Sequence, residues 1–263
     1  MKTLLSLFDM TGTASQPYWD AGWDVTMIDI QHGDDINDFC CEHIVENLPH
    51  TSYDHVIMQP PCTDFTNAGA RLWKDKDEDG RTAISAELVL QGLRTIEFIK
   101  PDVWWLENPI GRIDQVVDLG PRRAIIQPWH YGQITKPTAA ELQLLAATAE
   151  KAGREAWDEI TADEIAASKR TNAYTKQTGL WGYFRLPEKQ PIDPVKVCKQ
   201  GSWLMKLGGK SAKTKNLRSA TPEGFAQAMF DANKDLTIDF DQLEEDGLEW
   251  PGFDQEGLLE LIH

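Results

Sequence analysis

The sequence predicts an α/β fold in which helices alternate with the strands of one open sheet. Short apolar runs recur between residues 3 and 184, and segments with helical spacing of apolar residues lie between several of them. The chain opens with a strand, a loop, a helix and a second strand, which is the unit that builds such sheets. A length of 263 residues, 41% of them hydrophobic, suits one α/β domain with additions or one domain plus a small lobe.

The opening unit has the arrangement that holds a nucleoside-containing cofactor. We expect a strand at Thr3–Phe8, a loop at Asp9–Ser15, a short helix and a second strand at Asp24–Ile30. In such units the first loop offers backbone amides, and an acid at the end of the second strand binds ribose hydroxyls. Asp29 is the candidate acid. The loop contains one glycine, Gly12, so the glycine pattern by itself is a weak signal.

A second acidic loop follows and leads into a helix that is expected to run toward Leu48. Asp35 in this loop can accept a hydrogen bond from an exocyclic amine of a base. The same side chain can instead cap the helix, because Asp is favoured at helix N-caps. Both roles stay open.

A stiff loop that carries a cysteine follows the third strand. The apolar run His55–Met58 predicts a buried strand, and Pro60 and Pro61 end it because proline cannot donate to the ladder of a central strand. Each proline also fixes its own φ and pushes the residue before it toward extended geometry, so Cys62 is held at the carboxyl end of the strand. In open α/β sheets that edge binds ligands. The alternative is a buried structural cysteine, since free cysteine is mostly a small hydrophobe.

Another strand end carries a carboxylate. Trp104–Pro109 predicts a strand that ends in Glu107, Asn108 and a proline. An exposed loop acid is the alternative interpretation of Glu107. A cysteine and a glutamate at adjacent strand ends can converge on one small substrate. The presence of both therefore favours a functional site over a structural cysteine and a surface acid.

The remaining elements follow in order along the chain. The alternating charges of Lys74–Arg81 predict a polar surface loop rather than a site. Thr138 and Thr161 each precede a glutamate in capping-box spacing, which predicts the starts of two helices. Thr221 and the proline after it predict the start of a last helix. The other expected elements are a helix at Ile84–Lys100, a strand at Arg123–Gln127, helices at Thr138–Lys151 and Thr161–Arg170, a strand at Thr178–Phe184 and a long loop or small lobe at 185–220.

Charge is distributed unevenly. The formal net charge is -16, which by itself disfavours nucleic-acid binding. The segment from Val195 to Ala220 nevertheless has no acidic residue, and the chain from Asp231 onward is strongly acidic. These stretches are either two solvated surfaces or a phosphate-contacting segment with an acidic tail that competes for it. The basic residues are Lys196, Lys199, Lys206, Lys210, Lys213, Lys215 and Arg218.

Other classes of protein are disfavoured. The sequence has no run of 18 apolar residues, so we expect no membrane-spanning helix. It starts directly with strand-like residues, so we expect no signal peptide. Its cysteines form no CxxC pair and, with the scattered histidines, no metal-ligand spacing, which favours a reduced cytoplasmic setting and no metal. The four cysteines are Cys40, Cys41, Cys62 and Cys198.

Several motifs resemble, in order and strand context, those of the DNA cytosine-5 methyltransferases. Phe8-Asp9-Met10-Thr11-Gly12 lies where that family has its Phe-x-Gly-x-Gly cofactor loop. Asp29 resembles the ribose-binding acid, and Asp35-Ile36 the adenine-contacting pair. Pro60-Pro61-Cys62, with Phe65 and Ala68-Gly69 after it, is similar to the nucleophile motif, and Glu107-Asn108-Pro109 to the Glu-Asn-Val motif. The resemblance covers residues 3–132, and its last two motifs are specific together but weak singly.

The resemblance implies a Rossmann-like, S-adenosylmethionine-dependent methyltransferase sheet with a helical insertion and a small C-terminal lobe. It implies methyl transfer to carbon 5 of a cytosine that is flipped out of DNA, through a covalent adduct with Cys62. Glu107 and Asn108 would be the other catalytic residues, and Pro61 and Lys176 would contact the substrate. The implied cofactor-binding residues are Phe8, Asp9, Thr11, Gly12, Thr13, Asp29, Ile30, Asp35, Ile36 and Pro60.

The expected organisation has three parts. A catalytic domain covers 1–184 with its insertion near 135–175, a basic loop or reduced target-recognition lobe covers 185–220, and a helix with an acidic tail covers 221–263. Compact relatives of this shape occur in bacteriophages, which favours a phage origin and the host cytoplasm.

The sequence departs from the family at four places, one of which is the helix that starts at Thr221-Pro222, where the family's Gly-Asn is missing. Met10 replaces the first glycine of the cofactor loop. Tyr131-Gly132 is followed by the helical insertion where the family has Gln-x-Arg-x-Arg, and Lys176 is the candidate substitute for its base-holding arginine. The large target-recognition domain is absent or reduced.

Two alternatives therefore remain. The enzyme can act on a free cytosine nucleotide or a single strand, which the acidic net charge favours and the basic segment disfavours. The chain can instead be a non-catalytic binding protein whose acidic tail mimics nucleic acid. The presence of both Cys62 and Glu107 speaks against that alternative.

Overall fold

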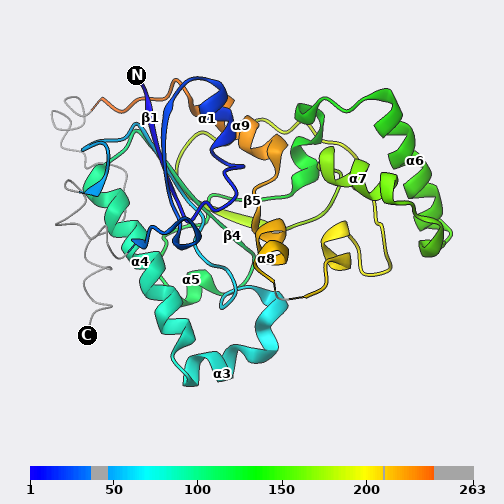
Figure 1. Cartoon of the computed structure of the whole chain (residues 1–263), viewed down its shortest axis with the longest axis horizontal. Coiled ribbons are helices and arrows are strands. Elements are labelled where there is room, and N and C mark those ends of the chain that lie inside the picture. Colours follow the sequence, from blue (N-terminus) through cyan, green and yellow to red (C-terminus); the bar gives the residue numbers. More distant parts are fainter. Residues whose placement is uncertain (37–46, 210, 240–263) are drawn as a thin grey trace. The chain divides into compact units, whose positions relative to one another are not determined.

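The computed structural model describes residues 1–36, 47–209 and 211–239, and its largest element is one six-stranded sheet with helices packed against it (Figure 1). The strand order is β2-β1-β3-β4-β6-β5. The α/β, Rossmann-like fold class is therefore confirmed. The strands are β1 (Thr3–Leu7), β2 (Asp24–Ile28), β3 (His55–Met58), β4 (Val103–Pro109), β5 (Ala124–Ile126) and β6 (Thr178–Tyr183).

Four strands of the sheet run parallel. β1 pairs with β2 and β3, and β3 pairs with β4, whereas β6 runs antiparallel to β4. All residues of β3 are buried, which is the pattern of a strand covered on both faces of a parallel sheet. All six strands were expected from the sequence. The reversed direction of β6 was not, because an apolar run carries no information about strand direction.

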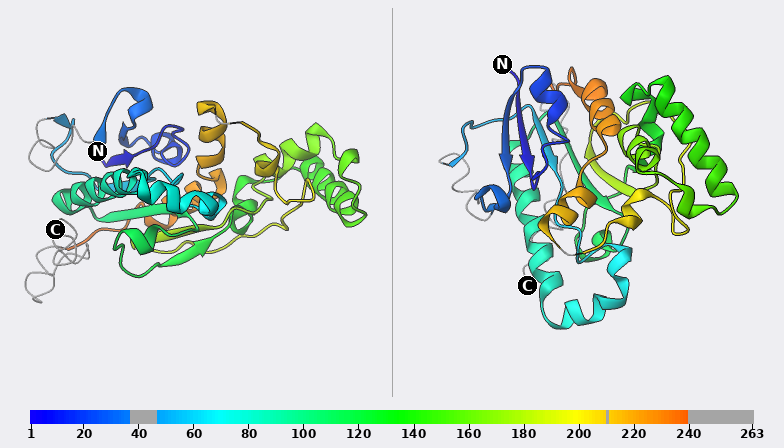
Figure 2. Two further views of the ribbon diagram at one scale, coloured as in Figure 1. Left: turned by 90° about the horizontal axis from the view of Figure 1, so that it is seen from below. Right: turned by 45° about the vertical axis from the view of Figure 1, so that its right-hand side comes forward.

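Helix α4 (Arg81–Ile99) supplies much of the core that supports the sheet. Its buried side chains Val89, Leu93 and Ile96 pack in one cluster with residues of β1 and β3. Figure 2 shows this helix running alongside the strands. Among the described helices, this one included, none is both long and apolar enough to cross a membrane.

The described chain divides into two compact units. The first comprises residues 1–125, 178–185 and 233–239, and it contains the sheet. The second comprises 126–177 and 186–232, and it has a hydrophobic cluster of its own. Its helices are α6 (Ala139–Gly153), α7 (Ala162–Arg170), α8 (Ala212–Ser219) and most of α9 (Glu223–Asn233).

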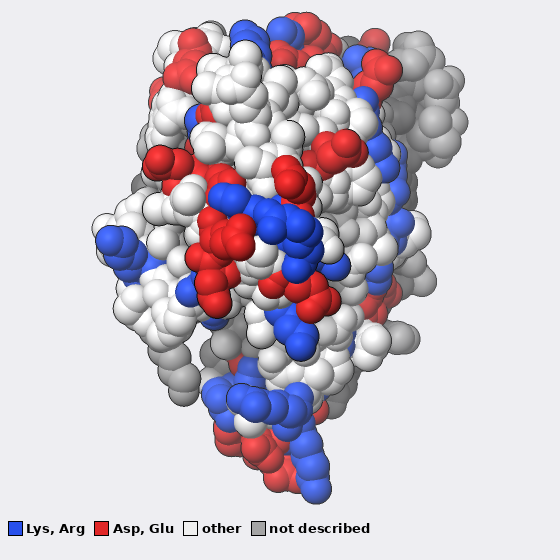
Figure 3. Space-filling view, turned by 90° about the vertical axis from the view of Figure 1, so that its right-hand side faces the viewer, with Lys and Arg blue, Asp and Glu red and all other residues white. Residues whose placement is uncertain are grey.

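The predicted starts of α6 and α7 are confirmed. Thr138 and Thr161 each accept a hydrogen bond from the backbone of the residue three positions on, and both capping boxes are complete. The two helices also carry ion pairs, among them Lys151 with Glu164. Figure 3 shows basic and acidic side chains interspersed on the face of the molecule that it presents. This is the pattern of a solvated surface.

The stretch Lys74–Arg81, predicted as a polar surface loop, is mostly exposed as expected, but it is not a loop. This stretch forms helix α3 (Trp73–Glu78) and the start of α4, and Lys76 within it is 3% exposed. The charge pattern did not predict this helix, because it gives no sign that Lys76 points inward and pairs with Asp64. The region 185–220 also contains a helix, α8, that was not expected. Cys40, Cys41, most of the helix expected before Leu48, Lys210 and the acidic chain after 239 lie outside the described residues.

We expect Gly182→Ala to destabilise the sheet strongly. Gly182 has φ +127°, and an added Cβ would lie 2.3 Å from Trp104 O in the paired strand β4. Backbone strain and overpacking together predict a loss on the order of 3 kcal/mol in the free energy of unfolding. Urea denaturation followed by circular dichroism measures it.

The matched control is Gly153→Ala in α6, where an added Cβ meets nothing within 4 Å. This change should stabilise the protein by about 0.5–1 kcal/mol or leave it unchanged. Equal stabilities for the two variants would contradict the close approach of β4 and β6.

Candidate active site

The carboxyl ends of the four parallel strands meet at one edge of the sheet. Leu7 of β1 is in register with Ile28 of β2 and Met58 of β3, and Met58 with Leu106 of β4. The residues that follow these positions therefore emerge side by side. They are Phe8, Asp29, Gln59 and Glu107.

The loop after β1 is organised by a buried carboxylate. Asp9 is 0% exposed and accepts hydrogen bonds from Ser6 Oγ at 3.0 Å, Ser15 Oγ at 2.8 Å and the backbone amide of Gly12 at 2.8 Å. These bonds offset the cost of burying the charge. Asp9, which the resemblance assigned to the cofactor, therefore shapes the loop. Thr11 is exposed, Thr13 is half-buried, and their hydroxyls lie 3.2 Å apart.

Two residues of this loop have left-handed backbone. Gly12 has φ +66°, and Phe8 has φ +62°, which is uncommon for a residue other than glycine. The Phe8 amide donates to Ile28 O at 2.7 Å, so pairing with β2 continues through the strained residue. Met10 does not have a positive φ, so its backbone does not require the glycine that the family has there.

The end of β2 presents an acid next to an exposed apolar side chain. Asp29 is 9% exposed, and its Oδ1 accepts from the Gln31 amide at 2.8 Å, capping the short helical turn Ile30–His32. Ile30 is 73% exposed although it is apolar. Asp35 is half-buried, and Ile36, 3% exposed, belongs to the core cluster of the sheet.

Cys62 begins a single helical turn after β3. Its carbonyl accepts from the amides of Phe65 at 3.1 Å and Thr66 at 2.9 Å. We call residues 62–66 the Cys62 turn. The thiol is half-buried and outside any disulfide among the described residues. Pro60 is buried, and Pro61 is exposed.

The end of β4 is joined directly to the loop that carries Cys62. Asn108 is 0% exposed, and its Nδ2 donates to Pro60 O at 3.1 Å. Its Oδ1 is buried with no hydrogen-bond partner in the described part of the chain. Glu107 is 6% exposed and precedes it on the strand. The two strand ends that the sequence singled out therefore lie together, with an amide fixing their spacing.

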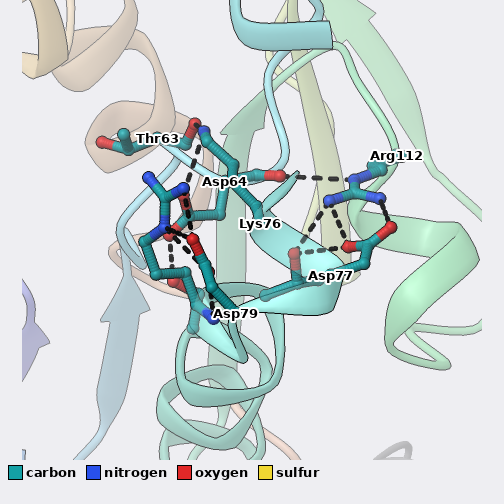
Figure 4. Close-up of polar contacts among 9 residues, drawn as sticks. Thr63, Asp64, Lys76, Asp77, Asp79 and Arg112 are labelled. Carbon is teal, nitrogen blue, oxygen red and sulfur yellow. Dashed lines mark hydrogen bonds and ion pairs between the residues drawn. The ribbon is translucent and has the colours of Figure 1, made fainter. Parts of the chain in front are cut away.

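A set of charged residues around the Cys62 turn was missed by sequence reasoning. Arg112, which follows the end of β4, donates through both Nη atoms to the two oxygens of Asp77 in α3, each at 2.8 Å (Figure 4). These bonds, with one from Thr82, lower the pKa of the Asp77 carboxyl to about 2. Lys76 pairs with Asp64 of the turn at 3.0 Å. The alternating charges before Arg81 were the only signal in the sequence.

Lys176 belongs to the second unit. Its Nζ donates to Ser219 O at 3.1 Å and Ala220 O at 3.2 Å, and its amide donates to Gln127 Oε1 at 2.9 Å. Gln127, Ser219 and Ala220 belong to the same unit as Lys176. Its assignment to the substrate stays a prediction.

Comparison with known proteins gives one kind of match. No protein-family model matches the chain, and no curated protein does. Among solved structures, the chain is similar to a prophage-encoded E. coli protein that is provisionally described as a DNA modification methyltransferase, at 16% identity and a TM-score of 0.41. The match covers 74% of this chain and 53% of that one, so this chain spans about half the length of its structural neighbour.

We expect Asp77→Asn to change stability in a pH-dependent way. The usual pKa of the carboxyl is 3.8 and its folded value is about 2, so the pair with Arg112 contributes fully above the usual value and its contribution is lost as the pH falls through the folded value. The urea midpoint of the unaltered protein should exceed that of the variant at about pH 7, and the two should converge as the pH falls below about 2.

Asp75→Asn, an exposed change in the same helix, is the control and should leave the pH dependence unchanged. A difference between Asp77→Asn and the unaltered protein that persisted at the acid end would contradict the ion pair as its source.

Proposed function

We propose that this chain transfers a methyl group from S-adenosylmethionine to carbon 5 of cytosine in DNA, through a covalent adduct with Cys62. One observation carries the proposal. The turn that begins at Cys62 and the strand end that carries Glu107 lie at the same sheet edge, joined by the hydrogen bond from Asn108 to Pro60. A nucleophile and a proton donor at neighbouring strand ends suit attack on a flat, polar ring.

The residues at the ends of β1 and β2 fit an adenosyl cofactor. Asp29 has a carboxylate at the position where nucleoside sites bind ribose hydroxyls. The exposed side chain of Ile30 offers an apolar contact for a purine ring, and the loop that Asp9 shapes offers backbone amides. When bound, this cofactor supplies an electrophilic methyl group.

Cys62 supplies the nucleophile because carbon 5 of cytosine is too weak a nucleophile by itself. The thiolate adds to carbon 6, and the electron pair of the 5,6 double bond moves into the ring, which makes carbon 5 reactive toward the methyl group. Glu107 donates a hydrogen bond or a proton to ring nitrogen 3 and contacts the exocyclic amine, which stabilises the charge that the addition creates. Asn108 holds the two loops in place.

The adduct is resolved by elimination. A base, which we assign to water, removes the proton from carbon 5. The electrons of that bond restore the double bond, and the sulfur of Cys62 leaves carbon 6 as a thiolate. The site is then returned to its starting state with carbon 5 methylated.

Exposed cations in the second unit favour a polymeric substrate. Within the described residues, the basic side chains of the segment 195–220 are all exposed, and none is ion-paired with a carboxylate. Such side chains suit the phosphates of a nucleic acid, from which the target cytosine must leave the stack at a cost of a few kcal/mol. The alternatives, a free cytosine nucleotide or a single strand, would need fewer of these contacts. The described residues of this set are Lys196, Lys199, Lys206, Lys213, Lys215 and Arg218.

The first test is transfer of label from methyl-labelled S-adenosylmethionine to duplex DNA, single-stranded DNA, RNA and dCMP. We expect label on DNA with the unaltered protein. Cys62→Ala should abolish transfer while the cofactor still binds, because only the nucleophile is lost. Glu107→Gln should lower kcat by about 10²–10⁴-fold.

Cys198→Ser is the matched control, since this buried thiol donates to the backbone carbonyls of Gly201 and Ser202 and belongs to the second unit. It should retain transfer. Turnover by Cys62→Ala, or label on none of the four substrates with folded protein, would refute the proposed reaction.

Salt dependence separates a polymer from a nucleotide. We expect binding to duplex DNA to weaken steeply with salt, and Lys213→Gln to reduce the magnitude of the slope of log K against log salt by about 1. Arg154→Gln is the control, because that cation is paired with Glu150 and Glu159. A slope near zero, or one unchanged by Lys213→Gln, would favour the nucleotide.

A further inference from the structure

Helix α3 carries a buried lysine, Lys76, and a charged side chain is energetically unfavourable in the protein interior. Lys76 is 3% exposed, and a buried ammonium destabilises a protein unless it is paired and hydrogen-bonded. Its Nζ lies 3.0 Å from Asp64 Oδ1 and donates to Thr63 O at 2.6 Å. Both acceptors belong to the Cys62 turn, and one is the carbonyl of the residue next to the thiol. The hydrogen bond and the ion pair of Lys76 therefore both hold this turn.

Asp64 is held on each of its polar oxygens. Besides its pair with Lys76, its Oδ2 accepts from Ser85 Oγ at 2.6 Å, and its carbonyl accepts from Arg112 Nε at 3.3 Å. Figure 4 shows Lys76 and Arg112 next to Asp64. Since Ser85 belongs to α4, the turn is tied to two helices and to the segment after β4.

The segment after β4 touches the same turn through its backbone. The Arg112 amide donates to Phe65 O at 2.9 Å, and Thr66 forms a bridge with Gly111. A Cβ at Gly111 would lie 1.9 Å from Phe65 O, so the approach requires glycine. The strand end that carries Glu107 is thereby linked to the far side of the Cys62 turn.

We propose that Lys76 is a positioning residue for Cys62. The proposal rests on the proposed function, in which the sulfur must meet carbon 6 of the base. Asn108 fixes the chain before the thiol at Pro60, and Lys76 fixes the chain after it at Thr63 and Asp64. With both sides held, the sulfur keeps its place relative to Glu107. A displacement of about 1 Å in such an arrangement can lower the rate about 10²-fold.

The test compares Lys76→Met with Lys74→Met, which alters an exposed lysine of the same helix. The side chain of Lys74 is 84% exposed and that of Lys76 is 3% exposed. For Lys76→Met we expect kcat for methyl transfer to fall about 10²-fold. The Kd for S-adenosylmethionine should not change, because Lys76 lies outside the proposed cofactor residues. Lys74→Met should behave as the unaltered protein.

A second variant separates positioning from stability, because Lys76→Met leaves the partly buried Asp64 carboxylate without its ion-pair partner. Lys76→Met with Asp64→Asn removes both charges and should restore the urea midpoint. We expect kcat to stay low in this double variant, since the ammonium that holds the turn is still missing. Recovery of kcat together with the midpoint would overturn the proposal and leave Lys76 a purely structural residue.

Hydrogen exchange gives a readout that does not depend on catalysis. The amides of Phe65 and Thr66 bond to the Cys62 carbonyl, so they report the order of the turn. In the double variant we expect both to exchange at least about tenfold faster than in Lys74→Met. Unchanged exchange would overturn the proposal. Should the unaltered protein transfer no methyl group, the proposed function fails while this measurement still decides whether Lys76 holds the turn.

Discussion

The parallel register of β1, β2, β3 and β4 is the constraint on which the candidate site depends. Because Leu7, Ile28, Met58 and Leu106 lie side by side, the next residue of each strand emerges at one edge. A slip of one residue would send every side chain of a strand to the other face of the sheet. The apolar runs of β1, β3 and β4, whose residues are nearly all buried, hold the register. The polar residues after them can then differ freely in chemistry.

Polar groups are buried at this edge, and they fix loops that the sheet alone would leave free. Their burial has a desolvation cost, which their hydrogen bonds offset. The Asp9 carboxylate is buried to shape one loop, and the Asn108 amide is buried to join two. Lys76 is buried to hold a third. Each group is hydrogen-bonded, and a single deletion would leave a partner unsatisfied, which is why buried networks are sensitive to change. Loops held in this way keep reactive groups in place without a ligand.

The sequence predicted the structure well where a local pattern of residues determines a local element. Runs such as His55–Met58, and the capping boxes at Thr138 and Thr161, gave the strands and helix starts because each depends on neighbouring residues. Long-range choices were not encoded locally. The direction of β6 depends on its pairing with β4. The inward orientation of Lys76 depends on Asp64, twelve positions earlier in the chain, and no local pattern distinguishes it from the exposed Lys74.

The same reasoning predicted part of the candidate site. Cys62 and Glu107 were found because two strand ends carried unusual residues, and the bond from Asn108 to Pro60 shows that those ends meet. The role of Asp9 inside its own loop was not foreseen. A resemblance in sequence predicts where a residue lies but not which atoms it bonds. Here the Ser6 and Ser15 hydroxyls donate hydrogen bonds to the Asp9 carboxylate.

The acidic net charge does not exclude a polyanionic substrate. At physiological ionic strength charges are screened beyond about 8 Å, so a phosphate responds to the charges near it rather than to the total. On α6 and α7, cations such as Lys151 and Arg170 are neutralised by Glu164 and Glu141. On α8 the exposed cations have no acidic partner among the described residues. A local excess of this kind attracts phosphate in a chain of net charge -16 as it would in a neutral one.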